Sequence, residues 1–122
     1  MAMYTSVTGW LGCEHSQVEE IRKIISGCEF STEFEYIMDY ETRKFYNKGW
    51  CFQKESINWT AYVFYGADIK DYCVDFIKTE IKEIAGKIDE VNGLFLFQHE
   101  EGEIICWKIV ESNITEEKIS AC

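Results

Sequence analysis

The chain has 122 residues, with 22 acidic and 12 basic side chains and a formal net charge of −10. This length fits one domain. Hydrophobic residues make up 47% of the chain and aromatic residues 16%, which is enough apolar surface for a packed core and excludes general disorder. A strongly negative domain repels phosphate backbones and attracts basic proteins. The charge therefore argues against nucleic-acid binding and favours a basic protein partner.

The N-terminal segment lacks the basic and apolar regions of a signal peptide, and no apolar run approaches the roughly 20 residues of a membrane span. We therefore expect a cytoplasmic protein with no membrane association, and Met3 makes Met1-Ala2 interpretable as a cloning remnant. In a reducing compartment the six cysteines are expected to stay free thiols. Most lie in apolar patterns, so we expect five to resist alkylation and only Cys122 to react.

The first predicted element is a strand over residues 4–13, because apolar residues alternate there with polar ones. A helix is predicted next. Ser16 and Glu19 match a capping box at its start. Gly27 matches a left-handed cap near its end.

A second strand is predicted over residues 33–40, where the pattern has a period of two, with one apolar and one mostly acidic face. We interpret residues 41–48 as a turn or bend and residues 49–54 as a short strand. Residues 59–65 are strongly β-prone and carry apolar or aromatic side chains on both faces. This pattern predicts a central strand.

The second predicted helix opens with Asp68 as its N-cap and ends near Gly86. Two further strands are predicted over residues 94–98 and 104–110, joined by a hairpin loop with a glycine at the bulge position. Residues 116–122 are expected to form a frayed tail.

The predicted element order is β-α-β-β-β-α-β-β. This order favours the α+β class: a single domain over residues 1–122, with an antiparallel-rich sheet of five to six strands and two helices on one face. Both helices carry a single apolar stripe, which is consistent with that layering.

Catalytic and metal chemistry find little support. Cys13-Glu14-His15 groups three potential metal ligands, but no CxxC or HxxxH spacing accompanies them. Cys106 and His99 lie on consecutive hairpin strands, yet Cys106 sits in an apolar strand and is better explained by core packing. The many carboxylates show no sign of the differing environments that a glycosidase pair needs. We expect no enzyme activity, no cofactor and no metal.

The acidic clusters, taken together with the net charge, predict a binding surface for a basic partner. Aromatic residues are dense between residues 50 and 65. Either both faces of the central strand are buried, or one face exposes aromatic anchors beside acids, as interfaces often do. The predicted partner-binding residues are Glu33, Glu35, Asp39, Glu41, Trp50, Tyr62, Asp68, Asp71, Glu100, Glu101 and Glu103.

Three of these acids, Glu33, Glu35 and Asp39, are expected to project together from one strand face with no structural role. Changing all three to Lys should then weaken partner binding and leave the fold intact. The hairpin acids Glu100, Glu101 and Glu103 are the next candidates.

Four segments resemble small bacterial immunity proteins, the inhibitors encoded beside the toxins of contact-dependent growth inhibition and related polymorphic toxin systems. The segments are residues 47–52, 57–69, 4–10 and 93–97, and the resemblance covers most of the chain. Its motifs are aromatic and structural. It implies a cytoplasmic, non-enzymatic protein, with a monomer favoured, that binds and blocks a cognate toxin domain.

Many such toxins are nucleases, and a ribonuclease is favoured here. A nuclease presents cations to bind phosphates, so an inhibitor that presents carboxylates has a complementary potential and associates fast. Two other interpretations stay open: an acidic nucleic-acid mimic that inhibits a host defence or restriction enzyme, and a small enzyme with an unrecognised carboxylate site.

Overall fold

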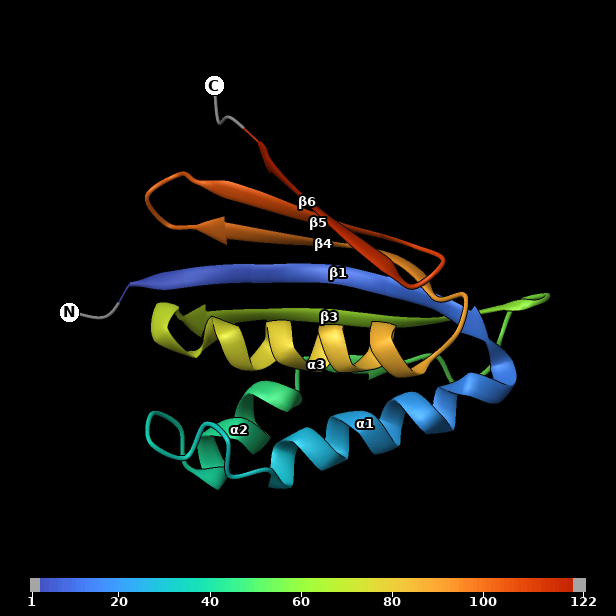
Figure 1. Cartoon of the computed structure of the whole chain (residues 1–122), viewed down its shortest axis with the longest axis horizontal. Coiled ribbons are helices and arrows are strands. Elements are labelled where there is room, and N and C mark those ends of the chain that lie inside the picture. Colours follow the sequence, from blue (N-terminus) through green and yellow to red (C-terminus); the bar gives the residue numbers. More distant parts are fainter. Residues whose placement is uncertain (1–2, 120–122) are drawn as a thin grey trace.

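The computed structural model describes residues 3–119 as one six-stranded antiparallel sheet with three α-helices against one of its faces (Figure 1). The spatial order of the strands is β2-β3-β1-β4-β5-β6. This arrangement confirms the predicted α+β class. The elements are β1 (Tyr4–Glu14), α1 (Val18–Phe30), α2 (Tyr40–Asn47), β2 (Trp50–Phe52), β3 (Thr60–Lys70), α3 (Val74–Lys87), β4 (Asn92–His99), β5 (Ile104–Val110) and β6 (Asn113–Ile119), with 3₁₀ turns η1 (His15–Gln17) and η2 (Asp71–Cys73) before α1 and α3.

β1 lies at the centre of the sheet, between β3 and β4. Val7 and Leu11 are fully buried, as the alternation in this segment predicts. Gly9 lets Phe95 of β4 lie across β1, because a Cβ on Gly9 would fall 2.4 Å from the Phe95 ring. A side chain at position 9 would therefore displace the core aromatic.

One core lies between the helices and the covered face of the sheet. α3 contributes its apolar stripe, whose Phe76, Ile77 and Ile81 are at most 1% exposed. α1 contributes Ile21 and Ile25 to the same cluster. The stripes on the first and last helices are therefore confirmed as buried faces.

The segment between α1 and β2 differs from the prediction, because residues 33–40 do not form a strand. Residues 33–37 form turns, and Asp39 caps α2 by accepting a hydrogen bond from the Thr42 N–H at 2.9 Å. Met38 is buried while Tyr36 is 82% exposed, so the apparent apolar face does not share one environment. The predicted turn at residues 41–48 is mostly helix α2.

α2 is held by a buried cation rather than by an apolar stripe. Arg43 is 2% exposed. Its Nε donates to the Glu29 carbonyl, and its Nη1 donates to the Met38 carbonyl and to Glu35, each at 2.7–2.8 Å. Because a buried guanidinium needs acceptors, these contacts order the whole α1–α2 connection.

Both predicted helix starts also differ. Position 16 lies in η1, and the side chain of Gln17 accepts from the Glu14 N–H at 2.9 Å. β3 runs on to Lys70, paired with Tyr4, so position 68 is strand and the helix begins at Val74. The long partner strand β1 extends β3 beyond the point where Gly66 suggested an end.

The predicted end of the second helix is confirmed, since α3 ends at Lys87, one residue after Gly86. The predicted end of the first helix and the predicted tail need correction, because Gly27 lies inside α1, which ends at Phe30. Residues 116–119 belong to β6, whose Glu116 accepts from Trp107 Nε1 at 2.8 Å. The expectations for Met1-Ala2 and Cys122 fall outside the described residues. Within residues 3–119, no helix is long and apolar enough to cross a membrane.

Candidate functional site

One face of the sheet is covered by none of the helices of residues 3–119, and we call it the open face. Along β1, β3 and β4, residues that alternate with the buried ones point to this side: Trp10 lies opposite Phe64 and Leu94. Tyr62 is 37% exposed and Phe64 is 44% exposed. β3 therefore buries one face and exposes aromatics on the other. The open face is formed by Trp10, Cys51, Tyr62, Phe64, Leu94 and Leu96.

The open-face aromatics form a continuous row across two strands. The Trp10 and Tyr62 rings meet edge to face with centroids 5.7 Å apart, and Tyr62 and Phe64 stack at 6.2 Å. Trp59, at the end of the turn before β3, is 84% exposed. Water-exposed aromatic area of this kind is favourable to bury against a partner.

Acidic side chains border this row. Asp68 lies on the open side of β3, where its Oδ1 accepts from Ser6 Oγ at 2.7 Å. Glu14 lies on the same side at the other end of β1, and Glu117 of β6 pairs with Lys108 at 3.6 Å. The open face therefore carries apolar anchors with the carboxylates Glu14 and Asp68 at the two ends of β1 and β3, and the ion pair of Glu117 with Lys108 lies farther out on the same face.

Trp50 does not belong to this surface, so its predicted role in partner contact is corrected. It points into the core, is 7% exposed, and meets the Tyr65 and Phe95 rings edge to face. Its Nε1 donates to Glu80 at 3.2 Å. The period of two places Trp50 on the covered face, opposite Tyr65.

Glu80 is fully buried on α3, and burial raises its pKa to about 8. Two buried oxygens, Glu80 Oε2 and Asn47 Oδ1, have no hydrogen-bond partner among the described residues. A protonated Glu80 has an O–H that can donate a hydrogen bond to an unpaired acceptor such as Asn47 Oδ1, whereas a carboxylate has no proton to donate. The buried group therefore stabilises the core in its neutral form.

Four predicted acids lie away from the open face, three of them in the α1–α2 connection and Glu41 in the first turn of α2. Glu35 pairs with Arg43 at 2.7 Å, and Asp39 caps α2. The hydrogen bond from the Thr42 backbone N–H holds the pKa of Asp39 below its usual value. Two of the three acids expected to lack a structural role therefore have one. Glu33 and Glu41 are exposed.

The remaining predicted acids gather at the end of the sheet near the β4–β5 hairpin. Asp71 accepts from Thr5 Oγ1 and from His99 Nε2, the latter at 3.0 Å. Glu100 accepts from the Tyr4 N–H, and Glu103 pairs with Lys118 at 3.1 Å. Several of these carboxylates therefore hold the ends of β1, β4 and β6 together. Glu101 is exposed.

Within the described residues, neither the Cys106–His99 pair nor a metal site that includes Cys13, Glu14 and His15 is assembled. His99 Nδ1 accepts from the Glu101 N–H, so its Nε2 carries the proton that Asp71 accepts. Cys106 lies opposite Leu96 on the open side of β5, whereas His99 lies opposite Thr5 on the covered side. Among residues 3–119, no three acidic, histidine or cysteine side chains are close enough to hold a metal.

The five described cysteines are free thiols, but they are not equally buried. Cys13, Cys73 and Cys106 are buried, and Cys28 is half-buried. Cys51 is exposed on the open face, which corrects the expectation that it is protected. β2 is an edge strand, so nothing on its outer side covers that thiol.

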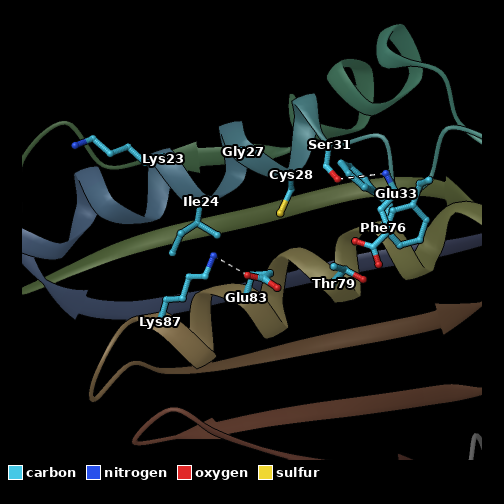
Figure 2. A pocket seen from close by; sticks show the side chains of 11 residues that line it. Lys23, Ile24, Gly27, Cys28, Ser31, Glu33, Phe76, Thr79, Glu83 and Lys87 are labelled. Carbon is cyan, nitrogen blue, oxygen red and sulfur yellow. Dashed lines mark hydrogen bonds and ion pairs between the residues drawn. The ribbon is translucent and has the colours of Figure 1, made fainter.

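A groove of about 440 Å³ lies between α1 and α3 (Figure 2). Ile24 and Cys28 face it from α1, and Glu83 pairs with Lys87 at 2.9 Å on the α3 side. Burial and nearby carboxylates raise the pKa of Cys28 to about 12, which keeps the thiol protonated and a poor nucleophile. The groove therefore offers shape without reactive chemistry.

Sequence reasoning selected only Tyr62 from the open-face row. Alternation in β1 could have found Trp10, because it shares a face with Ser6 and Thr8. Leu94 and Leu96 carry no such signal, since their neighbours are also apolar. Comparisons with family models, with curated proteins and with solved structures found no match for this chain. Its function is therefore inferred from the open face and the charge.

Proposed function

We propose that this chain is a cytoplasmic, non-enzymatic inhibitor of the bacterial immunity-protein kind, which binds and neutralises a basic toxin domain. The partner is a nuclease, with a ribonuclease favoured. The observation that carries the proposal is the exposed aromatic row of the open face, bordered by carboxylates in a chain of net charge −10.

The chemistry of the row suits a protein partner. Aromatic side chains supply large contact area with few rotatable bonds, and binding energy concentrates in such anchors at the centre of interfaces. Tyr62 lies at the centre of the row, between Trp10 and Phe64, and both Tyr62 and Phe64 are on a strand with hydrogen-bonded neighbours on both sides. The anchors are therefore preorganised.

The border carboxylates suit a cationic partner. A nuclease binds its substrate through a positively charged surface. Glu14 and Asp68 present negative charge at opposite ends of β1 and β3, so they attract such a surface and speed association. Occlusion of that surface is enough for inhibition and requires no catalytic group on the inhibitor.

The test is coexpression with the toxin domain encoded beside the gene for this chain. Cells should survive with the wild-type chain, and the purified chain should inhibit the toxin. The double variant Tyr62→Ser, Phe64→Ser should lose protection and weaken binding at least tenfold, since it removes the central anchors.

The matched control is Tyr36→Ser, which removes an aromatic that is 82% exposed but lies in the α1–α2 connection. It should protect like the wild type, and both proteins should give native circular dichroism spectra. Full protection by the folded open-face variant would overturn the proposal. Inhibition of a restriction enzyme, with the adjacent toxin unaffected, would instead favour the nucleic-acid mimic.

A further inference from the structure

One end of the open face is hollowed into a cleft of about 430 Å³. It lies where Gly12 of β1 is flanked by Tyr62 of β3 and Asn92 of β4. The volume falls in the range of small-molecule pockets, roughly 300–1,000 Å³. The residues that define its chemistry are Trp10, Gly12, Glu14, Trp59, Tyr62 and Glu90.

The floor of the cleft is formed by Gly12, which has no side chain to fill it. A Cβ on Gly12 would lie 3.4 Å from the Tyr62 ring and 3.6 Å from the Trp10 ring, which is ordinary contact distance. Those two rings meet edge to face above the strand. A side chain at position 12 would therefore lie against both rings and occupy the floor of the cleft.

A tight turn supplies the third aromatic wall. Ile57 and Thr60 form an isolated bridge, and Asn58 takes the left-handed backbone conformation with φ 64°. Asparagine tolerates this conformation better than most residues. The turn holds Trp59 against the cleft while leaving its indole 84% exposed.

The electrostatics of the cleft are one-sided. Glu14 and Glu90 are exposed carboxylates, and neither forms an ion pair with any residue between 3 and 119. No Lys, Arg or His of the described chain lines the cleft. The faces of aromatic rings are also electron-rich, so rings and carboxylates favour the same kind of occupant.

We infer that this cleft binds the guanidinium group of an arginine side chain of the partner protein. A planar, weakly hydrated guanidinium stacks on Trp and Tyr rings and donates two parallel hydrogen bonds to a carboxylate. An ammonium group makes both kinds of contact less well. The inference rests on the proposed function only in naming a protein as the source of the arginine.

The direct test titrates the chain with a capped Gly-Arg-Gly peptide and follows the indole N–H signals of all four tryptophans by NMR. The signals of Trp10 and Trp59 should shift and saturate. Those of Trp50 and Trp107 should stay in place, since both indoles are buried and bonded to Glu80 and Glu116.

Two control peptides define the chemistry. A citrulline peptide has the same shape without the charge and should bind at least tenfold more weakly. A lysine peptide should bind about threefold more weakly than the arginine peptide. Equal binding of the citrulline peptide, or no shift at Trp10 and Trp59, overturns the inference.

Variants of the chain test whether the residues of the cleft bind the peptide. The double variant Glu14→Gln, Glu90→Gln should bind the arginine peptide at least fivefold more weakly than the wild type. The control variant Glu20→Gln, Glu101→Gln changes two exposed sites away from the cleft and should bind it like the wild type. Gly12→Val should block the peptide by filling the floor. Wild-type peptide binding by a folded Gly12→Val protein would also overturn the inference.

The outcomes separate this inference from the proposed function. Arginine peptide binding without protection against the toxin leaves the cleft in place and removes the proposed function. Protection that is lost in the Tyr62, Phe64 variant but unchanged in the Glu14, Glu90 variant keeps the proposed function and removes the arginine contact.

Discussion

Both faces of the sheet are rich in aromatic residues, but these residues are buried on the covered face and exposed on the open face. On the covered face, Trp50, Tyr65 and Trp107 are buried, and each polar atom has a partner: Glu80, the Tyr46 carbonyl and Glu116. On the open face, the indole N–H groups of Trp10 and Trp59 and the Tyr62 hydroxyl have no hydrogen-bond partner among residues 3–119, and the bond from Tyr62 to Gln53 Oε1 comes from its backbone N–H. Aromatic content alone therefore does not distinguish the buried face of this sheet from its exposed face, whereas the burial and hydrogen bonding of the aromatic polar groups do.

The largest expected effect is on the covered face. Phe95→Ala removes a fully buried ring at the centre of the core and should lower the free energy of unfolding by about 3–5 kcal/mol. Phe64→Ala on the open face should lower it by about 1 kcal/mol or less. Urea denaturation of both variants measures the difference, and similar losses would contradict the contrast between the faces.

A pH-dependent effect is expected at Glu80. Its folded pKa of about 8 lies above the ordinary value of 4.5, so the folded protein binds more protons between these values. The contribution of Glu80 to stability should be complete below about pH 4.5 and should be lost as the pH rises to about 8. Glu80→Gln removes this loss and should gain stability that grows over this window, reaching a few kcal/mol. Denaturant curves at several pH values test it, and a constant difference would contradict the neutral assignment.

A smaller effect is expected at the cap of α2. Asp39→Ala removes the bond to the Thr42 N–H and should lower Tm slightly, while Asp39→Ser keeps an acceptor and should restore it. Because the folded pKa of Asp39 is lowered, its contribution is present at neutral pH and is lost as the pH falls through that value. Equal melting of all three proteins would remove the capping role.

The smallest effect on stability is expected from thiol labelling. Cys51 should be alkylated rapidly in the folded protein, whereas Cys13, Cys73 and Cys106 should resist until unfolding. Mass spectrometry of the digested protein identifies the labelled sites. A bound partner should protect Cys51 on the open face, and rapid labelling of the buried three would contradict the described core.

The sheet could largely be predicted, because β4 buries alternate residues, β1 and β5 do so over part of their length, and alternation is a local signal. α2 could not, since Arg43 and Asn47 supply much of its buried face and their acceptors come from distant residues. The alternation at residues 33–40 arises by coincidence: Tyr36 points to water while Met38 packs inside.

The candidate surface could be predicted only in part. Tyr62 follows from alternation within β3, but the meeting of Trp10 with Tyr62 depends on the register between β1 and β3. Glu90, which reaches the same cleft, lies in a turn with a left-handed backbone. No local pattern connects these positions, so the cleft exists only in the folded sheet.

The central place of β1 has a consequence for how the chain is made. β1 is the first strand of the sheet in chain order, yet its residues pair with partners as distant as Lys70, opposite Tyr4, and His99, opposite Thr5. Such distant pairings carry a loop-closure entropy and slow folding. β1 cannot pair with both of its neighbouring strands until residue 99 has left the ribosome, so folding of the central strand must follow translation of most of the chain. Formation of the folded sheet should therefore lag behind synthesis by the time that these long-range pairings require.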